Sequence, residues 1–200
     1  DATLRAFLVI GQAEDGEGLK PQYVLEELRD MTPDDTIVVS GVGQHQMWTS
    51  QYWKFNHPNT WVNSGGLGTM GFAVPAAIGA KAGRPDRMVW AVDGDGCFQM
   101  TAQELVTAAA ERIPVKIAIL NNAYLGMVRQ WQELFWDGRY SHVDMGELPD
   151  WVKLADAYGI WARKETDNTK LLGTLKAAIE HDGPALVDVR VTKEENTYPM

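Results

Sequence analysis

Apolar residues in this chain form short continuous runs, separated by longer stretches in which apolar residues recur three or four positions apart. The runs cover residues 36–40, 60–62, 89–92, 115–120, 160–163 and 185–191. Each run has the length of a strand and is bounded by turn residues. The runs therefore predict the buried strands of a parallel sheet.

The stretches between the runs have the spacing of amphipathic helices. Pro21 suits a first helical turn, and Val24, Leu25 and Leu28 follow at helical spacing. Further helices are predicted around residues 47–53, at 72–82, between the runs at 89–92 and 115–120, and at 126–136, 150–158 and 168–180. Because strands and helices alternate, we predict an α/β fold with a doubly wound, mostly parallel sheet flanked by helices.

The first 19 residues differ from the rest of the chain. An apolar piece at residues 4–10 precedes an acidic, glycine-containing run at 14–18, which is typical of a solvated linker. We therefore predict a linker or domain-boundary segment over residues 1–19 and one folded domain over residues 20–200. The chain begins with Asp1, so we expect a processed chain or a piece of a longer one.

Composition narrows the function classes. The net charge of −9 argues against a nucleic-acid surface, because phosphate binding needs a basic patch. No apolar run approaches the roughly 18 residues of a membrane span, and the start lacks the pattern of a secretion signal, so we expect no membrane partner. Cys97 is the only cysteine, which excludes an internal disulfide and fits a reducing, cytoplasmic location.

Two turns at strand ends carry the candidate chemistry. Gly94-Asp95-Gly96 follows one central run, and Asn121-Asn122 closes the next. A crossover helix between the two strands would bring Asp95 and Asn122 to the same carboxyl edge of the sheet, where open α/β sheets bind ligands. One carboxylate oxygen and one amide oxygen suit Mg²⁺ that shares its shell with a phosphate ligand. Either turn alone is common, whereas the pair, each closing a strand, is a specific signal.

The two turns resemble the thiamine diphosphate signature, in which Asp95 and Asn122 would hold Mg²⁺ and the metal would hold the diphosphate. Three further segments resemble the C-terminal domain of acetohydroxyacid synthase (acetolactate synthase) catalytic subunits. They are GVGQHQMW at 41–48, NSGGLGTMG at 63–71 and GMVRQWQ at 126–132. The resemblance extends from about Lys20 to Met200. It implies the thiamine-diphosphate-binding fold.

The resemblance also implies a set of cofactor contacts. They are Gly43, Gln44, His45, Gly68, Met70, Gly94, Asp95, Gly96, Cys97, Asn122, Tyr124, Leu125, Gly126, Met127 and Val128. Mg²⁺ would be held by Asp95, Asn122 and the backbone carbonyl of Tyr124. From its position alone, His45 could equally be structural. Cys97 has no evident paired base, so we do not predict a nucleophile there.

Met70 and the apolar stripe at residues 127–135 also have a simpler interpretation. On their own, a methionine before an apolar helix and an apolar helix face both indicate core packing. The resemblance implies instead that Met70 wedges between the two rings of thiamine diphosphate and holds the cofactor bent. It also implies that Met127 and Trp131 contact the second substrate.

The reaction implied by the resemblance is a condensation of two 2-oxo acids. Pyruvate would lose CO₂ on the cofactor, and the two-carbon unit would join a second pyruvate or 2-oxobutyrate, as in branched-chain amino-acid biosynthesis. We assign no catalytic side chain here, because the activating glutamate is expected in an N-terminal domain outside these 200 residues, and FAD in a middle domain. We expect the isolated chain to be inactive or nearly so, with active sites between subunits of a homodimer or larger assembly. A regulatory small subunit is a further expected partner.

Three alternatives stay open from the sequence. Another thiamine diphosphate enzyme, such as a 2-oxo acid decarboxylase or pyruvate oxidase, would share Asp95 and Asn122 but has less reason to carry the segment at 126–131. A non-catalytic diphosphate-binding module would carry the same turns without turnover. A nicotinamide oxidoreductase has the least support, because the Gly-x-Gly-x-x-Gly at residues 66–71 follows Ser64-Gly65 rather than a clear strand, and no suitable downstream acid is present.

Overall fold

A six-stranded parallel sheet organises the computed structural model, which describes residues 18–147 and 149–198. The strands lie in the order β2-β1-β3-β4-β6-β5, and every neighbouring pair is parallel. The chain runs outward from β1 to β2 and then returns past β1 to β3, so the sheet is doubly wound, as predicted. The strands are β1 (Ile37–Ser40), β2 (Trp61–Asn63), β3 (Val89–Gly94), β4 (Lys116–Asn121), β5 (Trp161–Glu165) and β6 (Ala185–Arg190).

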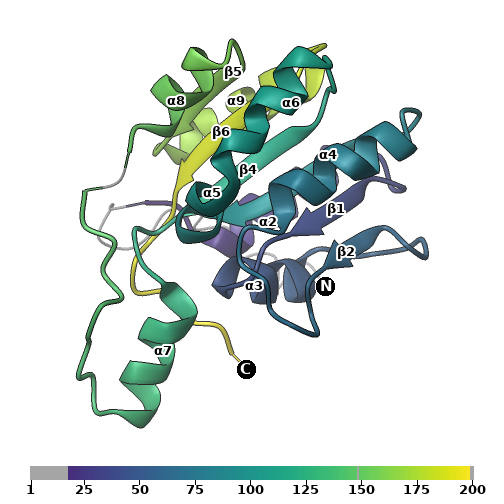
Figure 1. Ribbon diagram of the computed structural model, residues 1–200. Helices are drawn as coiled ribbons and strands as arrows, with labels where there is room; N and C mark the ends of the chain where they lie inside the picture. Colours follow the sequence, from purple (N-terminus) through teal and green to yellow (C-terminus); the bar gives the residue numbers. More distant parts are fainter. Residues whose placement is uncertain (1–17, 148, 199–200) are drawn as a thin grey trace.

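Helices cover both faces of this sheet (Figure 1). Those over one face are α4 (Ala73–Gly83), α5 (Asp95–Thr101), α6 (Leu105–Ala110) and α8 (Trp151–Ala157), and those over the other are α2 (Pro21–Asp30), α3 (Gln44–Tyr52) and α9 (Asn168–Glu180). In the described part of the chain, no helix is both long enough and apolar enough to cross a bilayer.

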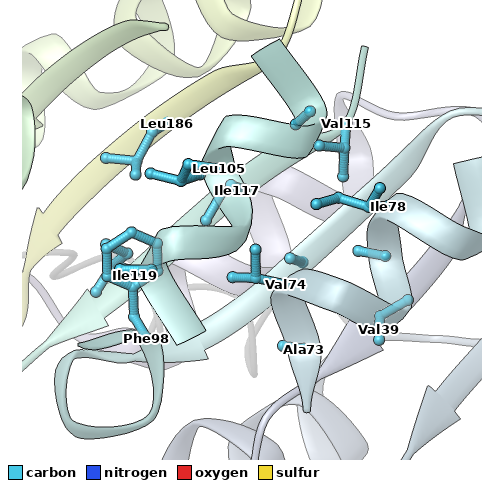
Figure 2. Close-up of a cluster of buried hydrophobic side chains, with 14 of the residues drawn as sticks. Val39, Ala73, Val74, Ile78, Phe98, Leu105, Val115, Ile117, Ile119 and Leu186 are labelled. Carbon is cyan, nitrogen blue, oxygen red and sulfur yellow. The ribbon is translucent and has the colours of Figure 1, made fainter. Parts of the chain in front are cut away.

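Two hydrophobic cores lie on opposite faces of the sheet. Successive strand residues point to opposite sides, so Ile117 and Ile119 of β4 belong to one core, and Ala118 and Leu120 belong to the other. Figure 2 shows the first core, where Phe98 and other helix residues pack over the strands. Because the strands are buried on both faces, they appear in the sequence as continuous apolar runs.

The helix predicted between the two central strands is divided into three pieces. α5 ends at Thr101, a 3₁₀ turn covers Ala102–Glu104, and α6 begins at Leu105. The backbone of Thr101 leaves the helical region, with φ −134° and ψ 20°, and its hydroxyl donates a hydrogen bond to the carbonyl of Gly71 at 2.8 Å. The prediction of one continuous helix was therefore wrong, because a contact with a distant loop interrupts it.

Helix α7 (Gly126–Phe135) projects away from the sheet and its covering helices (Figure 1). The interpretation of its apolar stripe as part of the core of this domain is wrong, since among the described residues Trp131 is 43% exposed and Phe135 is 67% exposed, and neither belongs to a hydrophobic core. Helical spacing indicates that one face of a helix is apolar, but it does not indicate what covers that face. The buried residue of α7 is instead a polar one, Gln130.

The described chain begins at the predicted domain boundary. Leu19 is fully buried, and its N–H and C=O form hydrogen bonds with the backbone of Arg190 and Thr192. The apolar piece predicted at 4–10 and most of the predicted linker lie outside the described residues. The boundary at residues 19 and 20 stays a prediction.

Candidate cofactor- and metal-binding site

A pocket lies at the carboxyl edge of the sheet, between the ends of β3 and β4. The two strands pair in register up to Gly94 and Leu120, so Asp95 and Asn122 follow directly at neighbouring strand ends. Both side chains line the pocket, as the crossover argument predicted. Its lining residues are Val42, Gly43, Gln44, His45, Trp48, Met70, Gly94, Asp95, Gly96, Cys97, Leu120, Asn122, Tyr124 and Leu125.

Three helices begin around this pocket. Gln44 is the first residue of α3, Asp95 is the first residue of α5, and Leu125 directly precedes the first residue of α7. The first N–H groups of a helix have no partner within the helix, and the helix dipole adds positive potential there. Helix starts that converge in this way would favour an anion such as a diphosphate in the pocket.

Asp95 places a buried carboxyl group in the pocket. Its side chain is 1% exposed, and its Oδ2 has no hydrogen-bond partner. Burial raises the pKa of Asp95 to about 7, while the charge of Arg190 acts in the opposite direction. A buried carboxylate oxygen without a partner is costly, and a bound cation would remove that cost. The residues present therefore fit a hard divalent cation.

The two asparagines after β4 have different environments. Asn121 braces the strand ends, because its Nδ2 donates to Oδ1 of Asp188 at 2.9 Å and its Oδ1 accepts from Arg190 at 3.0 Å. Asn122 lines the pocket, and its Nδ2 donates to Oε1 of Gln44 at 3.3 Å. Its Oδ1 accepts one backbone N–H at 3.1 Å and retains a second lone pair for a ligand.

His45 is packed closely against the turn that carries Asp95. A methyl group at Gly94 would come within 2.6 Å of Nδ1 of His45, so only glycine fits beside the ring. The opposite ring nitrogen, Nε2, lies 3.4 Å from Oδ1 of Asp93. The ring therefore lies between a buried carboxyl group and the pocket.

Cys97 lies beside the same turn but lacks the features of a nucleophile. Its Sγ donates to the carbonyl of Val42 at 2.9 Å. Burial raises the pKa of Cys97 to about 12, and Asp93, once ionised at high pH, acts in the same direction. The thiol is therefore protonated at neutral pH. Although its Sγ and donor atoms of His45 and Asp93 lie within 4.8 Å of one another, a protonated thiol is a poor metal ligand.

Met70 and Leu125 supply apolar side chains to the lining of the pocket. A methyl group at Gly96 would come within 2.8 Å of Cδ2 of Leu125 and 3.7 Å of Cε of Met70. The two side chains thus approach the turn after β3 from different loops. Tyr124 also lines the pocket, and its loop is fixed by a hydrogen bond from the N–H of Leu125 to the carbonyl of Val143 at 2.8 Å.

Some predicted site residues do not line this pocket. Gly68 lies in the loop before α4, with a φ of +63°. Gly126, Met127, Val128 and Trp131 lie on α7 and are not among the lining residues. These assignments stay predictions.

Several residues that shape the site were not predicted from the sequence. Val42, Trp48 and Leu120 line the pocket. The buried carboxyl group of Asp93 faces His45, and that of Asp188 accepts a hydrogen bond from Asn121. The sequence does mark Asp93 and Asp188, because each acid interrupts an apolar strand near the carboxyl end of that strand.

Comparisons with known proteins agree with this geometry. Residues 41–189 match the family described as thiamine pyrophosphate enzyme, C-terminal TPP binding domain. The acetolactate synthase large subunit of Corynebacterium glutamicum is 53% identical over 190 residues, which cover 92% of this chain and 30% of that protein. The mitochondrial acetolactate synthase catalytic subunit of Aspergillus candidus is 48% identical over 185 residues, which cover 91% of this chain and 26% of that protein.

The chain thus spans about a third of the length of these relatives or less. The family match covers both strand-end turns and the loop that carries Met70. The chain therefore belongs to the thiamine pyrophosphate enzymes, as a C-terminal TPP-binding domain.

Proposed function

We propose that this chain forms the diphosphate- and magnesium-binding half of the active site in an acetolactate synthase. The observation that carries the proposal is the unpaired Oδ2 of buried Asp95, in a pocket that Asn122 lines from the neighbouring strand end. The similarity to acetolactate synthases over most of the chain supports the reaction class.

In this proposal Asp95, Asn122 and the backbone carbonyl of Tyr124 hold Mg²⁺. The carboxylate supplies the charge, and the two neutral oxygens complete the protein's part of the shell. The diphosphate would bind between the metal and the helix starts at Gln44 and Gly126. The remaining contacts expected from the sequence would surround the same cofactor.

When bound, thiamine diphosphate supplies the electron sink that allows pyruvate to lose CO₂. The part played by this chain is orientation. Met70 reaches the pocket from the loop before α4 and would support a bent cofactor. Met127 and Trp131 on α7 would contact the second 2-oxo acid, pyruvate or 2-oxobutyrate. Exposed apolar side chains on α7 are available for such contacts.

The rest of the active site would come from outside these residues. We propose that an activating glutamate and an FAD-binding domain belong to other parts of the complete subunit, and that a homodimer or larger assembly completes the site. A regulatory small subunit would be a further partner. We also propose a cytoplasmic location, which the single, unpaired Cys97 supports.

The complete natural subunit tests this proposal. Supplied with pyruvate, thiamine diphosphate and Mg²⁺, it should release CO₂ and form acetolactate, and omission of Mg²⁺ should abolish both. Acetaldehyde or acetate as the main product would point to another thiamine diphosphate enzyme. Cofactor binding without any loss of pyruvate would point to a non-catalytic binding module.

A further inference from the structure

A chain of side-chain amides connects the pocket to the C-terminal segment of the described structure. Nδ2 of Asn122 donates to Oε1 of Gln44 at 3.3 Å, and Nε2 of Gln44 donates to Oε1 of Gln130 at 2.8 Å. Gln130 then pairs with the backbone of Thr197 in both directions. Its Nε2 donates to the carbonyl at 2.8 Å, and its Oε1 accepts from the N–H at 2.9 Å.

Gln130 is unusual for its place in the fold. It is 1% exposed in a helix whose apolar residues are largely exposed, so this polar side chain anchors α7 to the body of the protein. Both ends of its amide are bonded, and their partners lie 86 and 67 residues away in the chain. Loss of such a buried amide would leave several polar groups without partners, which is costly.

Gly126 leaves room for the contact between Asn122 and Gln44, the first link of this amide chain. A methyl group there would come within 2.0 Å of Oε1 of Gln44 and 2.8 Å of Nδ2 of Asn122. Any larger residue at the start of α7 would therefore displace the contact between these two amides.

The C-terminal segment is held by the same group of residues. Nε2 of Gln44 also donates to the carbonyl of Glu195 at 3.2 Å, and Nε2 of Gln22 on α2 donates to Oε1 of Glu195 at 2.6 Å. Residues 195–197 are thus fixed by α2, α3 and α7 together. Gln44 is the point at which this segment meets the pocket.

We propose that Gln130 is a positioning residue that couples metal binding at Asn122 to the docking of α7 and of residues 195–197. The inference rests on the proposed function, because it takes Asn122 as a metal ligand. A metal that orders the amide of Asn122 also orders Gln44, and Gln44 orders Gln130. Since coupling between sites is reciprocal, docking of the C-terminal segment strengthens metal binding by the same factor.

The metal site and the face of α7 that carries Trp131 would therefore become ordered together. Trp131 directly follows Gln130 on α7, so the face proposed to contact the second substrate is held in place when the metal site is occupied. A subunit without metal would hold α7 and residues 195–197 less firmly.

Helix α7 offers a matched control for this coupling. Gln132 makes the same reciprocal pair of backbone hydrogen bonds, with the N–H of Ser141 at 2.9 Å and the carbonyl of Ser141 at 3.1 Å. No hydrogen bond described for Gln132 leads to Gln44 or Asn122. Gln130→Met and Gln132→Met therefore remove the same chemistry from the same helix, and only the first breaks the amide chain.

The experiment measures hydrogen exchange and Mg²⁺ affinity in the complete subunit. In the unsubstituted protein, saturating Mg²⁺ with thiamine diphosphate should slow exchange in the peptide containing Thr197 about tenfold, the effect of roughly one net hydrogen bond. Gln130→Met should lose this slowing and bind Mg²⁺ about tenfold more weakly. Gln132→Met should stay within about twofold of the unsubstituted protein in Mg²⁺ affinity.

Gly126→Ala is a second variant for the case in which Gln130→Met does not fold. It keeps the pair between Gln130 and Thr197, so exchange without metal should be unchanged. At concentrations of Mg²⁺ and thiamine diphosphate that a titration shows to saturate this variant, the slowing should still be lost. Equal exchange with and without Mg²⁺ in the unsubstituted protein would overturn the coupling, as would unchanged Mg²⁺ affinity in Gln130→Met. A complete absence of Mg²⁺-dependent cofactor binding would overturn the proposed function itself.

Discussion

Nε2 of His45 and Oδ1 of Asp93 face each other at 3.4 Å inside the protein. Both side chains are buried, and both His45 Nε2 and Asp93 Oδ2 lack a hydrogen-bond partner. Burial lowers the pKa of His45 to about 3 and raises the pKa of Asp93 to about 8. The pair therefore carries no charge at neutral pH and places a neutral ring beside the pocket.

The raised pKa of Asp93 predicts a pH-dependent stability in the metal-free protein. The folded state holds a proton that the unfolded state releases near pH 3.8. This stabilisation is complete below that pH and is lost as pH rises to about 8. The melting temperature of the unsubstituted protein, relative to that of Asp93→Asn, should therefore fall between about pH 5 and about pH 8. The corresponding loss in the free energy of unfolding should be on the order of a few kcal/mol.

Asp86→Asn is the control for this measurement. Asp86 is on the surface, and the hydrogen bonds from Arg84 lower its pKa to about 2. Its removal should therefore not change how stability depends on pH over the same range. A difference between the unsubstituted protein and Asp93→Asn that is constant from about pH 5 to about pH 8 would mean that Asp93 is ionised in the folded state.

Asp95→Ala should abolish the Mg²⁺ dependence of cofactor binding in the complete subunit. Asp95 is the only charged ligand in the proposed metal site, and the two neutral oxygens alone hold a hydrated ion poorly. Thiamine diphosphate titrated with and without Mg²⁺ should give the same weak affinity in this variant. Asp86→Ala should behave as the unsubstituted protein. A metal dependence that survives in Asp95→Ala would refute the assignment of Asp95.

The strands and the two strand-end turns were predictable because local rules decide them. A buried parallel strand must be apolar on both faces, and one crossover places consecutive parallel strands side by side. The interruption at Thr101 was not predictable, since it depends on a hydrogen bond to Gly71, 30 residues earlier in the chain. The burial of Gln130 depends in the same way on Thr197, and no local pattern encodes that pairing.

Met70→Ala should reduce turnover more than cofactor affinity. The diphosphate end would remain bound to the metal and the helix starts, while the bent conformation loses its support. We expect turnover to fall about tenfold or more and cofactor affinity to change about threefold or less. Met100→Ala is a suitable control, because Met100 is 51% exposed and lines no part of the pocket. Unchanged turnover in Met70→Ala would show that Met70 only fills space.

Trp131→Leu should change the choice of second substrate more than the rate at which pyruvate is consumed. A core tryptophan would cost roughly 3–5 kcal/mol on truncation. Trp131 is 43% exposed on a helix that stands apart from both cores, so that cost does not apply. The melting temperature should therefore change little. Discrimination of one methylene is worth roughly 1–3 kcal/mol, which predicts a shift of about 5- to 150-fold in the ratio of products from pyruvate and 2-oxobutyrate.

Trp136→Leu separates a specific contact from a general effect of losing an indole on this segment. Trp136 directly follows α7, is 58% exposed, and is not among the residues proposed to contact substrate. Its substitution should leave the product ratio unchanged when both substrates compete. If Trp131→Leu keeps the parental ratio and lowers the melting temperature, Trp131 is covered by another part of the complete subunit and selects no substrate. If both variants shift the ratio equally, selection depends on the position of the whole helix, which Gln130 would then control.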